Sequence, residues 1–232
     1  MKAVLTVLSV VLMLGSYPKA FAGNTDIDEL QSVDRDWSLI KNDKRHNITT
    51  YTKWEQGKKY RTFKFSVVYD ATLDEVMRVA LDYTSFPKWY FRCKESKFLK
   101  VNAPYEATYY SLFSGPIGQP DREIIARVEV MPISQKNKSV TLKIESIADA
   151  PTANKEAIRA SLYQEVLFTP LEDGKVLSTS EGYFDPGGNP PAWASNYVQR
   201  NAAYETLLSM QRFIEMQKRV STTKPVPLKY RD

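Results

Sequence analysis

The feature that most constrains this fold lies near the C-terminus, where a tight turn precedes a long helical segment. The sequence Asp185-Pro186-Gly187-Gly188 is typical of a turn, because proline restricts φ and glycine tolerates positive φ. Asn189 is a candidate N-cap, and the two prolines after it suit the first turn of a helix. No Gly or Pro then interrupts the chain up to Thr223. This predicts a terminal helix of roughly seven turns.

The predicted helix has two unlike faces. At about 100° per residue, one stripe is aromatic at its start and aliphatic at its end, with Arg200 near its centre. The opposite side carries Glu205, Thr206, Ser209 and Arg212. We therefore expect the apolar stripe to pack against a large concave partner. Its members are Trp193, Tyr197, Tyr204, Leu207, Leu208 and Ile214.

The rest of the chain supplies that partner as strands. Residues 72–82 predict a short helix, with Thr72 and Glu75 at capping-box spacing, and residues 26–40 also show helical spacing. Alternating or β-rich runs predict the strands, which are residues 48–54, 60–69, 93–101, 105–113, 122–131, 139–147, 158–168 and 176–184. Short turns between strands favour an antiparallel sheet. We expect one α+β domain over residues 23–220, with a curved sheet around the terminal helix.

The two ends of the chain are expected to lie outside this domain. Residues 1–22 combine Lys2, a short apolar run and the small-x-small sequence Ala20-Phe21-Ala22, which is typical of a cleaved signal peptide. We therefore expect export to the periplasm or secretion. The proline-containing tail over residues 221–232 is expected to be disordered. The single cysteine, Cys93, excludes an internal disulfide.

Charge and composition exclude several functional classes. Removing Lys2 and Lys19 with the signal peptide lowers the formal net charge from +5 to +3, and no clustered basic patch indicates nucleic-acid binding. The one histidine, His46, lies in a predicted polar loop. One His and one Cys do not make a metal site. No phosphate-binding or dinucleotide-binding motif is present. We therefore predict no catalytic residues, no metal and no cofactor.

Five charged residues occupy positions where the pattern expects apolar ones. They are Arg122, Glu123, Arg159, Glu181 and Arg200. A buried charge is costly unless it is paired, so one interpretation is structural ion pairing, or an Arg200 head group that reaches solvent. The other interpretation is that some of them line a cavity and hold the polar end of an apolar ligand. The aromatic stripe has the same two interpretations, packed core or cavity wall.

Several ordered segments together resemble the StAR-related lipid transfer (START) domain family, in its bacterial exported form. The resemblance covers roughly residues 37–213. It rests on Trp37 with Ile48 and Tyr51, Leu81-Asp82-Tyr83 with Trp89, Gly115-Pro116 through Asp121-Arg122-Glu123, Ile158-Arg159-Ala160, and the turn from Asp185 to Trp193 with Asn196. Glu123 stands where the family has Asp. Some sterol-binding members place an acidic residue in the preceding strand, and this sequence has no clear counterpart to it.

The resemblance implies a helix-grip fold, with an antiparallel sheet around the C-terminal helix and an internal apolar cavity. It also implies binding of one lipid, such as a sterol or phospholipid. We expect a monomer that is not an enzyme and makes transient contact with membranes. The alternatives are a cyclase/aromatase-like or hydrolase-like enzyme with acid–base chemistry at Arg159, Tyr110 or Glu181, and an interaction module of the cell envelope. The candidate ligand-binding residues are Trp89, Tyr110, Arg122, Arg159, Glu181, Trp193, Tyr197, Arg200 and Tyr204.

Overall fold

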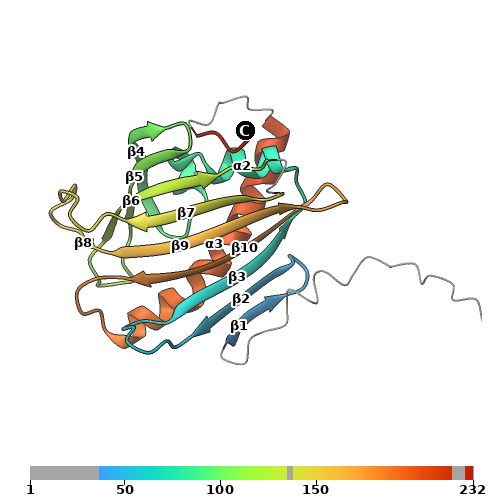
Figure 1. Cartoon of the computed structure of the whole chain (residues 1–232). Coiled ribbons are helices and arrows are strands. Elements are labelled where there is room, and N and C mark those ends of the chain that lie inside the picture. Colours follow the sequence, from blue (N-terminus) through green and yellow to red (C-terminus); the bar gives the residue numbers. More distant parts are fainter. Residues whose placement is uncertain (1–36, 135–137, 221–227, 232) are drawn as a thin grey trace, which may run out of the picture. The chain divides into compact units, whose positions relative to one another are not determined.

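One ten-stranded curved sheet and a long C-terminal helix make up the fold, as a computed structural model of the chain shows (Figure 1). The structure describes residues 37–134, 138–220 and 228–231. The predicted signal peptide therefore lies outside the described residues. Strand order along the sheet is β1-β2-β3-β10-β9-β7-β6-β5-β4, with β8 beside β6. All neighbouring strands pair antiparallel except β6 and β8, which pair parallel over two residues. The predicted helix-grip α+β fold is thus confirmed.

The element types follow the sequence pattern closely from residue 48 onward. Eight predicted strands appear as nine, because the run over residues 158–168 is divided at Ala160. The elements are β1 Ser38–Asp43, β2 Ile48–Lys53, β3 Thr62–Tyr69, α2 Leu73–Ala80, η1 Tyr83–Lys88, β4 Cys93–Ala103, β5 Glu106–Phe113, β6 Arg122–Met131, β7 Val140–Ser146, β8 Ile158–Arg159, β9 Ser161–Pro170, β10 Val176–Asp185 and α3 Ala192–Val220.

The strands at the centre of the sheet direct one row of side chains toward α3. In β3 the aromatic row predicted from alternation is Phe63, Phe65 and Tyr69, and these side chains face inward. The register places Ser178 of β10 opposite Val67 of β3. Because side chains alternate along a strand, these residues lie on the same concave face. Figure 1 shows α3 lying behind this part of the sheet.

The predicted short helix is confirmed as α2. The Thr72 side chain accepts a hydrogen bond from the Glu75 backbone amide (3.4 Å), and the Glu75 carboxylate accepts one from the Thr72 amide (2.8 Å). This reciprocal capping satisfies two amide groups that a helix start leaves unpaired. The buried side of α2, which includes Val76 and Met77, then packs near the end of α3.

The turn before α3 is held by the sheet. Gly187 has φ +66°, and a Cβ atom there would collide with the Arg159 backbone oxygen. Only glycine fits both constraints without strain. Asn189 does not cap the helix as expected. Its side chain instead accepts a hydrogen bond from Lys59 Nζ (3.1 Å), and α3 begins at Ala192, after both prolines.

Two local predictions are wrong where the structure describes them. The helical pattern over residues 26–40 ends in strand β1, because this segment pairs with β2 from Ser38 onward. The expected disordered tail includes residues 228–231, where Leu228 is buried and the Lys229 amide donates to the Pro104 carbonyl (2.7 Å). Apolar burial and backbone pairing hold these four residues to the sheet. Residues 26–36, 221–227 and 232 lie outside the described residues.

Candidate functional site

A cavity with a volume of about 240 Å³ lies between the concave face of the sheet and α3. Its wall is mostly apolar. Ligand pockets for small molecules typically measure roughly 300–1,000 Å³, so this cavity suits a slender ligand or part of a larger one. The sheet contributes Phe63, Phe65, Tyr69, Phe113, Ile124, Leu142, Ile144, Leu162, Gln164, Val166, Phe168, Ser178 and Phe184, and α3 contributes Ala194, Ser195, Val198, Gln199, Ala202, Ala203, Thr206, Leu207 and Met210.

The cavity exists because the first half of α3 presents small side chains to the sheet. Ala194, Val198 and Ala202 line the wall at helical spacing. In the second half of the helix, Phe213 and Ile214 are buried in the core instead. Small side chains on one half of a helix leave space that large ones fill on the other half.

An aromatic cluster closes one side of the cavity. Tyr83, Phe86, Trp89 and Tyr90 of η1 and the residues after it line the wall. The Phe86 ring lies 4.6 Å from that of Tyr83 and 4.9 Å from that of Trp89, centroid to centroid. Burial raises the pKa of Tyr90 to about 12 and that of Tyr83 further still. Both phenols are therefore neutral at physiological pH, so this wall carries no charge.

Arginine side chains mark the outer end of the cavity. Arg122 donates from Nε to the Pro186 carbonyl (2.8 Å) and from its guanidinium to the Pro120 carbonyl. Arg92 donates from Nε to the Ser114 carbonyl (2.9 Å) and from its guanidinium to the Gly115 carbonyl. Each guanidinium has five N–H donors, so both retain donors beyond these contacts. The arginines thus tie the segment between β5 and β6 and the turn before α3 around the cavity rim.

Hydroxyl groups mark the other end. Tyr69, which is buried, donates its hydroxyl hydrogen to Met210 Sδ (3.2 Å), a weak acceptor. Ser178 is 1% exposed, and its Oγ has no hydrogen-bond partner among the described residues. Farther along the wall, Gln164 donates from its side-chain amide to Ser180 Oγ (3.1 Å). This end of the cavity is therefore polar at a few atoms but uncharged.

Two of the nine predicted ligand-binding residues, Trp89 and Arg122, line the cavity. The others do not. Trp193 and Tyr197 are 54% and 39% exposed, and Arg200 is exposed as well. Leu207 and Ile214, at the aliphatic end of the predicted stripe, are buried as expected, whereas the aromatic end of the stripe does not face the cavity. The bulky aromatic residues then face outward, and Thr206, assigned to the opposite side, lines the cavity.

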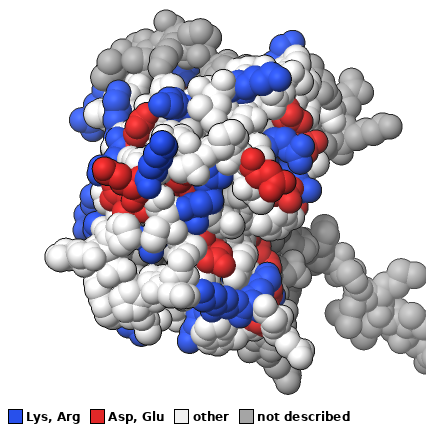
Figure 2. Space-filling model, turned by 90° about the vertical axis from the view of Figure 1, so that its left-hand side faces the viewer, with Lys and Arg blue, Asp and Glu red and all other residues white. Residues whose placement is uncertain are grey.

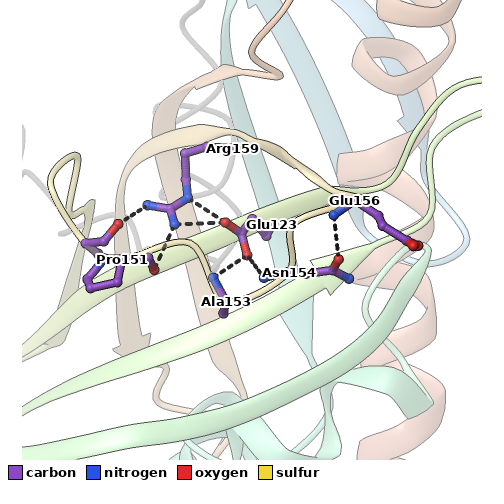
Figure 3. A network of polar contacts seen from close by, with 7 residues as sticks. Glu123, Pro151, Ala153, Asn154, Glu156 and Arg159 are labelled. Carbon is purple, nitrogen blue, oxygen red and sulfur yellow. Dashed lines mark hydrogen bonds and ion pairs between the residues drawn. The ribbon is translucent and has the colours of Figure 1, made fainter.

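Arg159 lies beside Glu123, away from the cavity wall (Figure 3), and Tyr110 packs with Leu112 and Ile125 in a hydrophobic cluster separate from the main core. Arg159 donates from Nε (3.2 Å) and a terminal nitrogen (2.8 Å) to the fully buried Glu123 carboxylate, and also to the Ala150 and Pro151 carbonyls. Glu123 further accepts the backbone amides of Ala153 and Asn154 (3.2 and 2.9 Å). Both the Glu123 carboxylate and the Arg159 guanidinium have hydrogen-bond partners. This network holds the loop between β7 and β8 to the sheet. The structural ion-pair interpretation is correct for Arg159.

Glu181 and Tyr204 also point away from the cavity. The Glu181 carboxylate lies 3.8 Å from Lys53 Nζ at the surface. The Tyr204 hydroxyl donates to Asp43 Oδ2 (2.7 Å), which also lies 2.7 Å from Nδ1 of His46. The Tyr204 hydroxyl and the His46 ring hold the pKa of the Asp43 carboxyl well below its usual range. The one histidine therefore helps to attach the β1–β2 hairpin to α3.

The cavity residues that sequence reasoning missed include large apolar strand residues such as Leu142 and Phe168, and also small or hydroxylated ones. The alternation in β3 did indicate Phe63, Phe65 and Tyr69 as one face. The same alternation in β10 puts Ser178 on that face, but a serine in a strand carries no signal of its own. Ala194 and Ala202 lacked a signal for the same reason, because alanine is common on every helix face.

The outer surface and the wider chain add three observations. On the face that Figure 2 shows, Lys and Arg side chains are interspersed with Asp and Glu, so this face has no large patch of one charge sign. No group of three His, Cys, Asp or Glu residues within the described ranges could hold a metal ion. None of the helices in those ranges has the length and apolar composition that a membrane span requires.

Comparison with known proteins places the fold. No protein-family model matches the chain, and no curated protein matches its sequence significantly. The STAR-related lipid transfer protein of Xanthomonas axonopodis (fragment 25–204) superposes with a TM-score of 0.69 at 23% identity, over 78% of this chain and 99% of that one. Human StAR-related lipid transfer protein 5 gives 0.68 at 10% identity, over 83% and 93%. The Zhui aromatase/cyclase of Streptomyces sp. R1128 gives 0.50 at 14% identity, over 69% and 97%. The chain has a START-like helix-grip fold.

Proposed function

We propose that this protein binds one hydrophobic ligand, a lipid, in the cavity between the sheet and α3, and carries it between membranes without chemical change. The observation that supports the proposal is the apolar cavity, with arginine side chains and uncharged hydroxyl groups in its wall. Solved structures with this fold include proteins named for lipid transfer. The similarity of fold supports the proposal, but the main support is the cavity of this chain.

The energetics of the cavity suit a carrier. Removing roughly 300 Å² of apolar ligand surface from water is worth about 7–8 kcal/mol at ~25 cal/mol/Å². Losses on association reduce that gain considerably. A membrane shelters the same apolar surface, so transfer between membrane and protein is close to balanced. A ligand can therefore be both taken up and released.

Exposed apolar side chains near the cavity rim support transient membrane contact as part of the proposal. Ile117, in the segment between β5 and β6, is 93% exposed, and Gly115, Pro116 and Gln119 of the same segment line the cavity. Trp193 is exposed next to the cavity-lining Ala194. Exposed apolar groups of this kind suit a lipid surface. We further propose that the protein is exported, on the basis of the signal-peptide pattern in residues 1–22.

The test is to identify what the protein carries. Mature protein purified from cells is extracted with chloroform, and the extract is analysed by mass spectrometry against a mock purification. We expect lipid in a one-to-one ratio with protein. Uptake of fluorescent fatty acid, sterol and phospholipid by protein freed of lipid is measured in parallel. Absence of lipid in the extract, together with no uptake of any of the three probes, would refute the proposal.

The likeness to an aromatase/cyclase makes an enzyme the second candidate. The acid–base residues expected for that alternative, Tyr110, Arg159 and Glu181, do not line the cavity. The cavity tyrosines Tyr83 and Tyr90 have raised pKa values and remain protonated near neutral pH. An enzyme would need to use them as hydrogen-bond donors or acids. Turnover of a bound ligand that is lost in a folded Tyr90→Phe variant would support this candidate over the carrier.

A further inference from the structure

The buried hydroxyl of Ser178 is unexplained by the fold alone. Its Oγ is inaccessible to solvent and has no hydrogen-bond partner among the described residues, yet Ser178 lines the cavity. A buried polar atom without a partner is destabilising, and in native structures such atoms usually have a partner. Alanine at this position would avoid the cost. A serine at this position is therefore better explained by a hydrogen-bond partner that binds and dissociates, such as a ligand.

The neighbouring serine on the same strand shows what a structural hydroxyl looks like here. Ser180 lies two residues from Ser178, on the same face of β10, and is also buried. Its Oγ donates to the Glu165 carbonyl (2.6 Å) and accepts from the Gln164 side-chain amide (3.1 Å). Both of its hydrogen-bonding roles are used within the fold. The same roles remain open at Ser178.

A second hydroxyl with spare capacity lies near Ser178. Ser178 is opposite Val67 in the β3–β10 ladder, and Tyr69 is two residues farther along β3 on the same face. Such diagonal neighbours lie roughly 7–8 Å apart, within reach of long side chains. The Tyr69 hydroxyl donates to Met210 Sδ, so its oxygen can still accept a hydrogen bond. Two hydroxyls thus border this part of the cavity, Ser178 able to donate and accept, and Tyr69 able to accept.

The charged end of the cavity is far from this pair. Phe184 and Ser178 both line the wall, and the six residue steps from one to the other along β10 span about 20 Å. Arg122 contacts Pro186, two residues beyond Phe184. The charged residues of the described wall are Arg61, Arg92 and Arg122, and Arg61 precedes β3 at this same end. The cavity is therefore elongated, with cationic groups at one end and neutral hydroxyls at the other.

We propose that the inner end of the cavity, at Ser178 and Tyr69, is a subsite for a neutral hydroxyl or carbonyl group of the ligand. The ligand class is a slender single-chain amphiphile, with an anionic or polar head at the arginine end and a second, uncharged polar group about 20 Å away. This inference rests on the proposed lipid-binding function. Ser178 selects among lipids by hydrogen bonding to the second polar group.

One other buried hydroxyl lacks a partner among the described residues, and it provides a control. Thr50 Oγ1 in β2 is as enclosed as Ser178 Oγ, but Thr50 does not line the cavity. If unpartnered hydroxyls were a general feature of this sheet, removing either one would have the same effect on ligand choice. If Ser178 contacts the ligand, only its removal changes ligand choice.

The experiment compares matched ligands with matched variants. Dodecanoic and hexadecanoic acids and their ω-hydroxy derivatives are titrated into lipid-free protein by isothermal titration calorimetry. The proteins are the wild type, Ser178→Ala, Ser178→Thr, which keeps the hydroxyl, and Thr50→Val. Circular dichroism checks that each variant is folded. We expect the wild type to prefer an ω-hydroxy acid by roughly three- to tenfold, the factor that one net hydrogen bond supplies.

The outcomes separate this inference from the proposed function. Loss of the preference in Ser178→Ala, with unchanged affinity for the plain acid and with the preference kept in Thr50→Val and Ser178→Thr, supports the subsite. Equal wild-type binding of plain and hydroxylated acids at both chain lengths overturns the subsite and leaves lipid binding intact. Such equality is also the result expected if Ser178 only holds a water molecule. A preference that persists in Ser178→Ala likewise overturns the subsite. Failure to bind any acid, with no lipid in the purified protein, counts against the proposed function itself.

Discussion

The two halves of α3 pack against the same sheet with side chains of different size. In the second half, Phe213 and Ile214 are buried and do not line the cavity, so this part of the helix belongs to the core. In the first half, the residues that face the sheet are mostly small, and a cavity separates helix and strands. One continuous helix thus has a structural half and a ligand-facing half. Stability and binding should therefore respond to different mutations along it.

The largest expected effect is on stability, in the second half. Phe213→Ala removes a buried aromatic ring from the core, and such changes cost about 3–5 kcal/mol. We expect a loss of this size in the free energy of unfolding, measured by urea denaturation followed by circular dichroism. Tyr197→Ala, at an exposed position in the first half, is the control and should stay within about 0.5 kcal/mol of the wild type. Equal losses in both variants would show that the halves are not different.

The converse substitution fills the cavity in the first half. Ala202→Phe adds a ring where the helix lines the cavity, so uptake of a fluorescent lipid should fall by roughly tenfold or more, the change that 1.4 kcal/mol of lost binding energy produces. Stability should fall by no more than about 1–3 kcal/mol, because added volume enters an existing space. Glu205→Phe, on the exposed side of α3, is the matched control and should leave uptake unchanged. Unaltered uptake by Ala202→Phe would place the ligand elsewhere.

A third change tests the boundary between the halves, where Tyr204 donates to Asp43. Tyr204→Phe removes the largest cause of the lowered Asp43 pKa, so NMR titration should show that pKa shifting upward. A depressed folded-state pKa stabilises the fold above the unfolded value, near 3.8, and this contribution disappears as pH falls through the folded value. The variant should therefore be less stable than the wild type at neutral pH, and the difference should shrink in strong acid. A constant difference at all pH values would exclude this linkage.

The smallest effect is expected at Arg200. This side chain is exposed on the first half of α3 and does not line the cavity. Arg200→Leu should change the free energy of unfolding by less than about 0.5 kcal/mol and leave lipid affinity and selectivity as they are. Calorimetric titration and urea denaturation check both quantities. A change in selectivity would restore the earlier expectation that Arg200 holds a ligand head group.

Arg122 and Arg159 show that two charged residues with similar sequence surroundings can have different structural roles. Arg122 and Arg159 both looked anomalous in the sequence, as charges in apolar surroundings. The structure puts Arg159 against the buried Glu123, where every group is paired, and puts Arg122 at the cavity rim. A pattern of residues identifies a buried charge, but the identity of its partner depends on contacts between segments far apart in the chain.

Much of the architecture could be predicted from local pattern. Alternation in β3, the capping box of α2 and the turn before α3 each act over a few residues, and they agree with the structure. The face of α3 could not be predicted in this way. Trp193 and Tyr197 formed the more conspicuous stripe, yet Ala194, Val198 and Ala202 face the sheet. The orientation of a helix depends on all of its tertiary contacts, so the aromatic end of a stripe does not by itself identify the face that meets the sheet.

By itself, the sequence determined the order and type of the elements and the antiparallel character of the sheet, because these depend on periodicity and turn chemistry between near neighbours. Only the tertiary structure decided where the cavity lies and which side chains line it. A cavity is the space that packed segments leave between them, so it has no sequence signal of its own. Ser178 carries the proposed subsite because the fold encloses its hydroxyl beside that space and leaves it without a partner among the described residues.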